Sequence, residues 1–156
     1  MGIEDPSAGV AMVPVELARL VQYDNAEQQF IHLREVGGTR GFPIVIGENE
    51  ANEIRRVVTG QRTERPLTHQ LAYQAIRELG CDLLRVDIVD LRSNTFFAQI
   101  VLHDGQGAIR TVLDARPSDA LALALRAKCP VRVAESVLAS LRPDQGPEPE
   151  EKPEKE

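Results

Sequence analysis

The residues best suited to chemistry lie in the run DARPSDA, at residues 114–120. Its polar members, just before an apolar segment, are Asp114, Arg116, Ser118 and Asp119. Proline is favoured at the first position of a helix because its missing N–H would be unpaired there, so we expect a helix to begin at Pro117 with Arg116 as its cap. A helix N-terminus can bind phosphate, and the flanking side chains are suited to anion binding or acid–base catalysis.

A second polar group lies in the run RPLTHQL, at residues 65–71. Thr68 is a natural N-cap, which puts His69 at the first helical position, where the helix dipole disfavours a charged imidazolium. A neutral imidazole can act as a base or bind a metal, whereas the structural alternative makes His69 only a polar residue of the first turn. Four arginines form a positive patch here that can steer a phosphate backbone: Arg55, Arg56, Arg62 and Arg65.

The elements that must position these residues follow from the apolar pattern. Alternating or continuous apolar runs predict strands at residues 13–21, 30–33, 42–46, 83–91, 96–102, 108–113 and 131–133. Residues 24–27 are expected to form a turn. Helices are predicted after Gly47, over residues 68–79, from Pro117 and from about Glu135. The helix over residues 68–79 has an apolar stripe that we expect to face the core: Leu71, Ala75, Ile76 and Leu79.

The pattern repeats along the chain, which predicts an internal duplication. At a constant shift of 69 residues, Asn25 falls on Asn94, Ile31 on Ile100 and Glu50 on Asp119. We therefore expect a single α+β domain over residues 13–141, built from two β-rich halves at about 13–80 and 81–141, with helices packed on the sheet.

Comparing the two halves separates shared structural residues from candidates for function. Asp119 and its counterpart Glu50 each lie three residues past a presumed cap, where a carboxylate can accept a hydrogen bond from the cap N–H. Asp114 has an apolar counterpart, so the fold alone does not require a carboxylate there. Asp114, Arg116 and Ser118 are therefore the stronger functional candidates, with local capping and pairing as the alternative.

Composition limits the class of protein. The 156 residues carry a net charge of −6, but the acidic excess lies at the two ends and the body is neutral and rich in arginine. We expect a flexible segment at residues 1–12 and a disordered acidic tail at residues 142–156. No apolar run is long enough to span a membrane, and the acidic N-terminus is unlike a signal peptide, so we expect a cytoplasmic protein. The signatures of serine hydrolases, phosphate-loop enzymes, dinucleotide-binding enzymes and zinc peptidases do not occur.

Three segments together resemble the bifunctional nuclease domain family: FPIVIGExEA at residues 42–51, RPLTH at residues 65–69 and DARPSDA at residues 114–120. The resemblance covers about residues 13–141 in order and spacing. It implies a duplicated α+β fold and an activity that cleaves both DNA and RNA. Members of the family often have an aspartate where this chain has Gln70, so a carboxylate that could serve as a metal ligand or base is replaced by an amide.

We therefore predict a nuclease that hydrolyses phosphodiester bonds of DNA and RNA. The candidate catalytic residues are His69, Asp114 and Asp119, and the candidate substrate-binding residues are Arg65, Thr68, Arg116 and Ser118. Hydrolysis needs charge stabilisation at phosphorus, which the arginines or a divalent cation such as Mg²⁺ or Mn²⁺ can supply. Nucleic acid is the expected partner, and we expect a homo-oligomer. The alternative is a non-enzymatic oligomeric module that binds a small anionic ligand or a protein partner.

Overall fold

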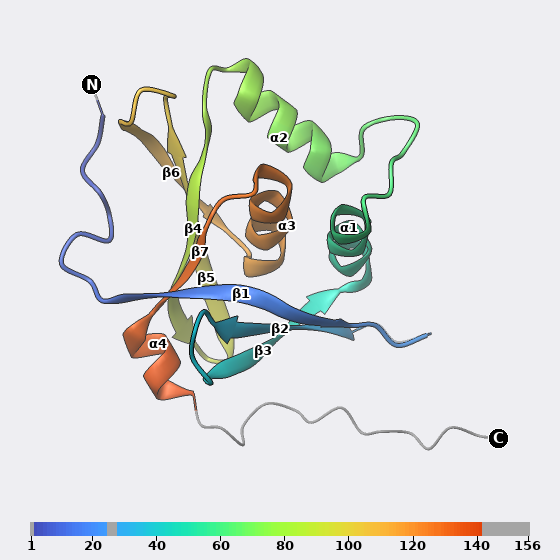
Figure 1. Ribbon diagram of the computed structural model, residues 1–156, viewed down its shortest axis with the longest axis vertical. Coiled ribbons are helices and arrows are strands. Elements are labelled where there is room, and N and C mark those ends of the chain that lie inside the picture. Colours follow the sequence, from blue (N-terminus) through green and yellow to red (C-terminus); the bar gives the residue numbers. More distant parts are fainter. Residues whose placement is uncertain (1, 25–27, 142–156) are drawn as a thin grey trace.

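A single seven-stranded sheet organises the protein, in the order β3-β2-β1-β7-β4-β5-β6. The computed structural model describes residues 2–24 and 28–141 (Figure 1). The strands are β1 (Met12–Val21), β2 (Gln28–Glu35), β3 (Gly41–Gly47), β4 (Asp82–Arg92), β5 (Thr95–His103), β6 (Ile109–Ala115) and β7 (Val131–Ala134). The helices are α1 (Glu48–Thr59), α2 (Thr68–Glu78), α3 (Pro117–Ala127) and α4 (Glu135–Ser140). The predicted turn beyond residue 24 and the predicted acidic tail at 142–156 lie outside the described residues.

The sheet joins two antiparallel meanders. Strands β1, β2 and β3 form the first and β4, β5 and β6 the second, and a helix follows the last strand of each. Strand β7 lies between them, antiparallel to β1 and parallel to β4. The expected α+β class is confirmed, with a mixed sheet and four helices over the described residues. The internal duplication stays a prediction.

The three longer helices lie within the curve of the sheet (Figure 1). Alternate residues of β2 and β3 are buried, as expected for strands that present one face to a core. Phe42 of β3 stacks on Phe96 of β5 with ring centroids 5.4 Å apart, although these strands are not neighbours in the sheet. The sheet is therefore curved strongly enough to bring its two meanders together across the core.

Helix α3 is the centre of this core. Its residues 120–124 are all buried, which explains why this segment is apolar all round. It contacts α1, α2, β4 and β5. The first turn of α3 is consequently held in place on several sides, and this turn carries the DARPSDA motif.

Helix α2 is oriented differently from our expectation. Of its predicted core stripe, only Ile76 is partly buried against the core, whereas Leu71 is 61% and Leu79 is 83% exposed. The inward face carries His69 and Tyr73 instead, and the Tyr73 hydroxyl donates a 3.1 Å hydrogen bond to Asp82. The prediction from apolar spacing was wrong here because polar contacts with the rest of the chain decide which side of α2 faces inward.

The outer face of the sheet is closed by a buried charge network. The carboxylate of Asp87 on β4 is fully buried and accepts hydrogen bonds from Arg85 and Arg132. Both arginines also donate to Ser7, and Arg85 pairs with Asp5. The N-terminal segment that we expected to be flexible therefore makes specific contacts with β4 and β7.

Replacing Asp87 by alanine is expected to lower the free energy of unfolding by about 3 kcal/mol, because two partly buried guanidinium groups lose their shared acceptor. Urea denaturation measures the loss. The matched control is Asp90→Ala, which removes the exposed pair with Arg92 and is expected to cost less than about 1 kcal/mol. Equal losses in the two variants would contradict this account of the outer face.

Candidate functional site

Four polar side chains meet where α1, α2 and α3 come together. His69 Nε2 lies 2.8 Å from Asp119 Oδ1, and Arg116 Nε donates to Asp119 Oδ2 at 2.9 Å. A terminal nitrogen of Arg116 donates to Glu50 Oε1 at 2.8 Å. We call Glu50, His69, Arg116 and Asp119 the three-helix cluster. It connects residues that are far apart in sequence into one continuous chain of hydrogen bonds.

The strand-to-helix turns position the cluster. Arg116 is the N-cap of α3, and Pro117 begins the helix as predicted. Gly47 is the N-cap of α1, and a Cβ at this position would clash with the carboxylate of Glu50. Glu50 and Asp119 thus lie in the first turns of two helices, where the positive ends of the helix dipoles favour negative charge.

The carboxylates do not act as the helix caps that we expected. Within the described residues, neither Asp119 nor Glu50 accepts a hydrogen bond from its cap N–H, and both bind the side chain of Arg116 instead. The N-cap of α2 is Leu67 rather than Thr68, so His69 is the second helical residue. The capping prediction was wrong because a guanidinium from the α3 cap competes for both carboxylates.

Hydrogen bonding keeps Asp119 ionised. Burial alone raises the pKa of Asp119, but hydrogen bonds from Arg116 and His69 and the charge of Arg116 outweigh burial, so the pKa lies below its ordinary value. The same contacts with Asp119 and Glu50 raise the pKa of Arg116. An ionised carboxylate only accepts hydrogen bonds, so the proton between His69 and Asp119 resides on Nε2. This arrangement orients the ring and leaves Nδ1 as its second functional atom.

The other predicted site residues are not joined to this cluster. Asp114 lies on β6 opposite Gln99 in an exposed position, and its carboxylate has no hydrogen-bond or ion-pair partner among the described residues. Ser118 is buried in the first turn of α3. Arg65 and Thr68 are exposed near the start of α2, and over the described chain neither side chain has such a partner. Of the predicted residues, the structure brings together His69, Asp119 and Arg116.

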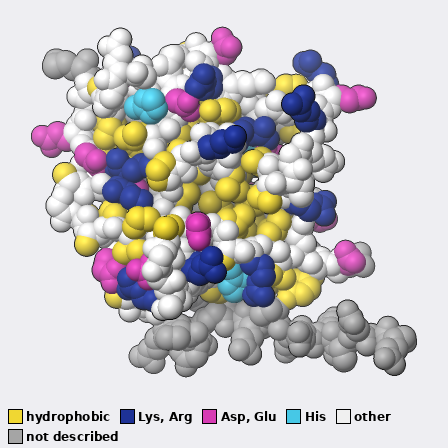
Figure 2. All heavy atoms as spheres, in the orientation of Figure 1, with side chains coloured by type: hydrophobic (Ala, Val, Ile, Leu, Met, Phe, Trp, Pro, Cys, Tyr) yellow, Lys and Arg dark blue, Asp and Glu magenta, His cyan; other side chains and the backbone are white. Residues whose placement is uncertain are grey.

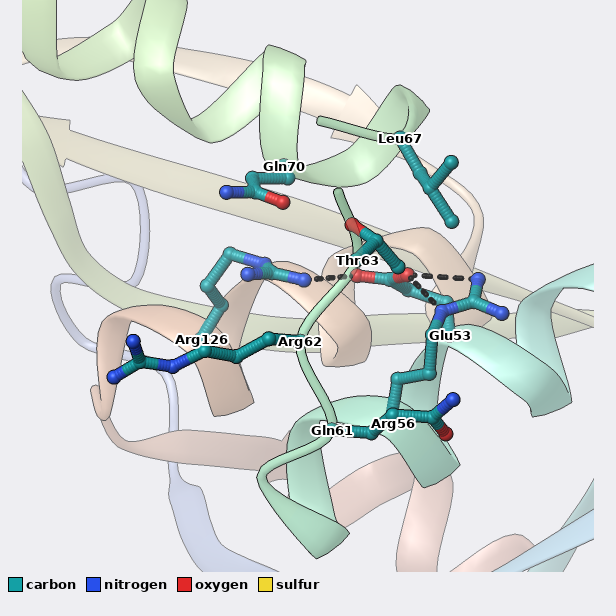
Figure 3. Close-up of a pocket in the computed structure, with 8 residues that line it drawn as sticks. All are labelled: Glu53, Arg56, Gln61, Arg62, Thr63, Leu67, Gln70 and Arg126. Carbon is teal, nitrogen blue, oxygen red and sulfur yellow. Dashed lines mark hydrogen bonds and ion pairs between the residues drawn. The ribbon is translucent and has the colours of Figure 1, made fainter. Parts of the chain in front are cut away.

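A pocket of about 350 Å³ is lined by residues of α1, α2, α3 and the α1–α2 connection, and the sequence did not predict it (Figure 3). It shares α1, α2 and α3 with the cluster, because Glu53 follows Glu50 by one turn and Gln70 follows His69 directly. The lining residues are Glu53, Arg56, Gln61, Arg62, Thr63, Leu67, Gln70 and Arg126. The arginines of α1 and of the α1–α2 connection were the available signal in the sequence. Arg126, which binds Glu53 from α3, has no local pattern that marks it.

The surface has the charge distribution that the sequence suggested. Figure 2 shows basic side chains gathered over the connection between α1 and α2, with an apolar area in the middle of the same face. No described helix is long and apolar enough to cross a membrane. Within residues 2–24 and 28–141, no group of three or more His, Cys, Asp and Glu side chains is arranged to hold a metal ion. The carboxylates of Glu50 and Asp119 are both engaged by Arg116, so the cluster does not fit a metal centre.

Fold and site together define an α+β domain with a His–Asp–Arg–Glu cluster at the meeting point of three helices. The sequence profile described as Bifunctional nuclease domain matches residues 31–144, which is most of the chain. The chain therefore belongs to the bifunctional nuclease domain family.

Relatives of this chain include proteins from bacteria and plants. Uncharacterized proteins Rv1829 and MT1877, from two strains of Mycobacterium tuberculosis, are each 42% identical over 125 residues, which is 78% of this chain and 73% of theirs. Bifunctional nuclease 1 of Arabidopsis thaliana is 28% identical over 93 residues, which is 59% of this chain and 29% of that protein. The family and this plant relative point to a nuclease-related function.

Replacing Asp119 by asparagine is expected to lower the Tm by about 2–4 °C at neutral pH. Because folding lowers the pKa of Asp119, its carboxylate stabilises the fold above the ordinary value of 3.8, and this contribution is lost as the pH falls through the lowered pKa. The difference between the variant and the unmodified protein should therefore disappear in acid. Thermal unfolding across a pH series measures it.

The matched control for that series is Asp114→Asn, because the Asp114 carboxylate has no hydrogen-bond or ion-pair partner among the described residues. It is expected to change the free energy of unfolding by less than about 0.5 kcal/mol at every pH. A deficit of Asp119→Asn that stays constant into acid would contradict the ionised contact with His69 and Arg116.

Proposed function

We propose that this protein hydrolyses phosphodiester bonds of DNA and RNA, with His69 and Asp119 as the catalytic pair. The observation that carries the proposal is the 2.8 Å hydrogen bond between His69 Nε2 and Asp119 Oδ1, across 50 positions of sequence. A carboxylate that holds an imidazole by one nitrogen leaves the other nitrogen oriented for proton transfer. Membership of the bifunctional nuclease domain family supports phosphodiester bonds as the target.

The proposed reaction uses water as the nucleophile, because DNA has no 2′-hydroxyl and one mechanism must serve both substrates. His69 Nδ1 accepts a proton from water while the water oxygen attacks phosphorus. The bond between phosphorus and the leaving oxygen breaks, that oxygen takes up a proton from solvent water, and the His69 imidazolium then returns its proton to solvent. Asp119 stabilises the imidazolium that forms, as an ionised carboxylate next to the ring does in other hydrolases.

Arg116 is the proposed electrophilic group. Its Nε and one terminal nitrogen are held by Asp119 and Glu50, and its side chain is 66% exposed. The remaining terminal nitrogen is therefore available to a phosphoryl oxygen, while the two carboxylates fix the plane of the guanidinium. A charge fixed in advance stabilises the developing negative charge without reorganisation in the transition state.

Cleavage of labelled single-stranded DNA and RNA tests the proposal, in parallel reactions with magnesium, manganese or a chelator. His69→Ala and Asp119→Asn are each expected to slow cleavage by about 100-fold or more, because each removes one half of the proton-transfer pair. His103→Ala is the matched control, since this histidine ends β5 and its ring accepts a hydrogen bond from the Gly105 N–H instead of joining the three-helix cluster.

Two results would overturn the catalytic assignment. Undiminished cleavage by His69→Ala, with loss in Asp114→Ala, would place the base at Asp114. No turnover by the unmodified protein in any of these reactions, with a rise in Tm on adding a small anion, would instead support the non-enzymatic binding module.

We also propose that the chain forms a homodimer through the outer face of α2. Leu67, Leu71, Ala75 and Leu79 are spaced four residues apart on this face and all are exposed. In an antiparallel pair of α2 helices, Leu67 faces Leu79 of the second copy and Leu71 faces Ala75. The stripe is thus complementary to itself, as an interface with two-fold symmetry requires.

Light scattering coupled to size-exclusion chromatography tests the dimer. The unmodified protein is expected to elute as a dimer, and Leu71→Glu as a monomer because charge enters an apolar contact. Val36→Glu is the matched control, since Val36 is also exposed but lies after β2. A monomeric unmodified protein, or a dimer unaffected by Leu71→Glu, would contradict this interface.

A further inference from the structure

The pocket beside the three-helix cluster has an unusual charge arrangement. Glu53 on α1 is only 1% exposed, and it is the sole acid among the lining residues. Arg56 and Arg126 bind its two carboxylate oxygens from opposite sides (Figure 3). Burial alone raises the pKa of Glu53, but hydrogen bonds from these two arginines outweigh burial and lower it. Glu53 is therefore a buried anion that fixes two guanidinium groups at the pocket wall.

Donors remain at this wall after Glu53 has been satisfied. Arg62 is exposed, has no ion-pair or hydrogen-bond partner among the described residues, and directs its guanidinium away from Glu53 (Figure 3). Arg126 Nε is buried and is the one side-chain polar atom of the described chain that is buried without a hydrogen-bond partner. Three guanidinium groups against one carboxylate leave the pocket positively charged.

We infer that this pocket binds the phosphate group of a nucleotide, either free or within a strand. The guanidinium of Arg62 donates to the phosphate oxygens, and Arg126, held by Glu53, adds positive charge at the wall. Planar guanidinium groups suit phosphate oxygens because two N–H groups can be donated in parallel. The volume of about 350 Å³ is within the range of small-molecule sites.

The remaining lining residues fit the rest of a nucleotide. Gln61, Thr63 and Gln70 offer amide and hydroxyl groups for a sugar or base. Gln70 directly follows His69 in α2, so the pocket and the catalytic pair share this helix, and in this proposal a strand whose phosphate is held here extends to the pair. The link to catalysis rests on the proposed function, whereas phosphate binding itself does not.

Binding of adenosine monophosphate by calorimetry, and of a fluorescent single-stranded oligonucleotide by anisotropy, tests the inference on the full chain. The oligonucleotide is measured in the His69→Ala background, with a chelator present, to minimise its cleavage during the measurement. Arg62→Ala is expected to weaken binding about tenfold, the loss of one charge-assisted hydrogen bond. The affinity of Arg62→Lys should lie between those of the unmodified protein and Arg62→Ala, because lysine keeps the positive charge but lacks the planar guanidinium. For the strand, Arg62→Ala should also reduce the slope of log K against log salt by about 0.7.

Arg110→Ala is the matched control, because Arg110 is an exposed arginine on β6 and its removal should leave the affinity of adenosine monophosphate unchanged. Arg62 dependence for both ligands, for the strand alone or for the nucleotide alone supports a phosphate site and identifies its source. Equal affinities of Arg62→Ala and Arg110→Ala for both ligands would overturn the inference, as would adenosine binding as tightly as its monophosphate. These outcomes are independent of whether the unmodified protein cleaves nucleic acid.

Discussion

The arrangement of α1, α2 and α3 depends on the hydrogen bonds that the Asp119 carboxylate accepts. One oxygen holds His69 of α2 and the other holds Arg116, which extends the connection to Glu50 of α1. Since α2 has no fully buried residue, packing alone does not fix its position. Asp119 therefore serves structure and the proposed chemistry together, because the hydrogen bond that locates α2 also orients the imidazole.

Glu53, one turn along α1 from Glu50, is a second carboxylate that binds side chains from more than one helix. Glu53 is buried, so its charge must be neutralised, and arginines from α1 and α3 do so. Ion pairs of this kind contribute less to stability than their number suggests, since desolvation offsets much of the attraction. Their effect here is geometric, because they hold guanidinium groups in defined positions around a cavity. The cluster and the pocket are thus two parts of one polar seam between three helices.

Local patterns predicted most of the fold because strand alternation and helix boundaries are local properties. Pro117 began a helix as predicted, and the strand predicted at residues 42–46 lies within β3. The orientation of α2 was not predictable from spacing, because Leu71 and Ile76 are equally apolar and a polar contact decides between the faces. The roles of Asp119 and Arg126 depend on partners 50 and 73 positions away, and local spacing in a single sequence does not show which distant residues pair.

The central claim is that His69 and Asp119 act as one unit in cleaving nucleic acid. A double-mutant cycle on the cleavage rate of single-stranded DNA tests it most directly, with His69→Ala, Asp119→Asn and the double variant measured under the same conditions. If Asp119 acts only through the imidazole, the double variant should cleave no more slowly than His69→Ala alone. Losses that multiply would contradict the account, because they would show that the two residues contribute independently.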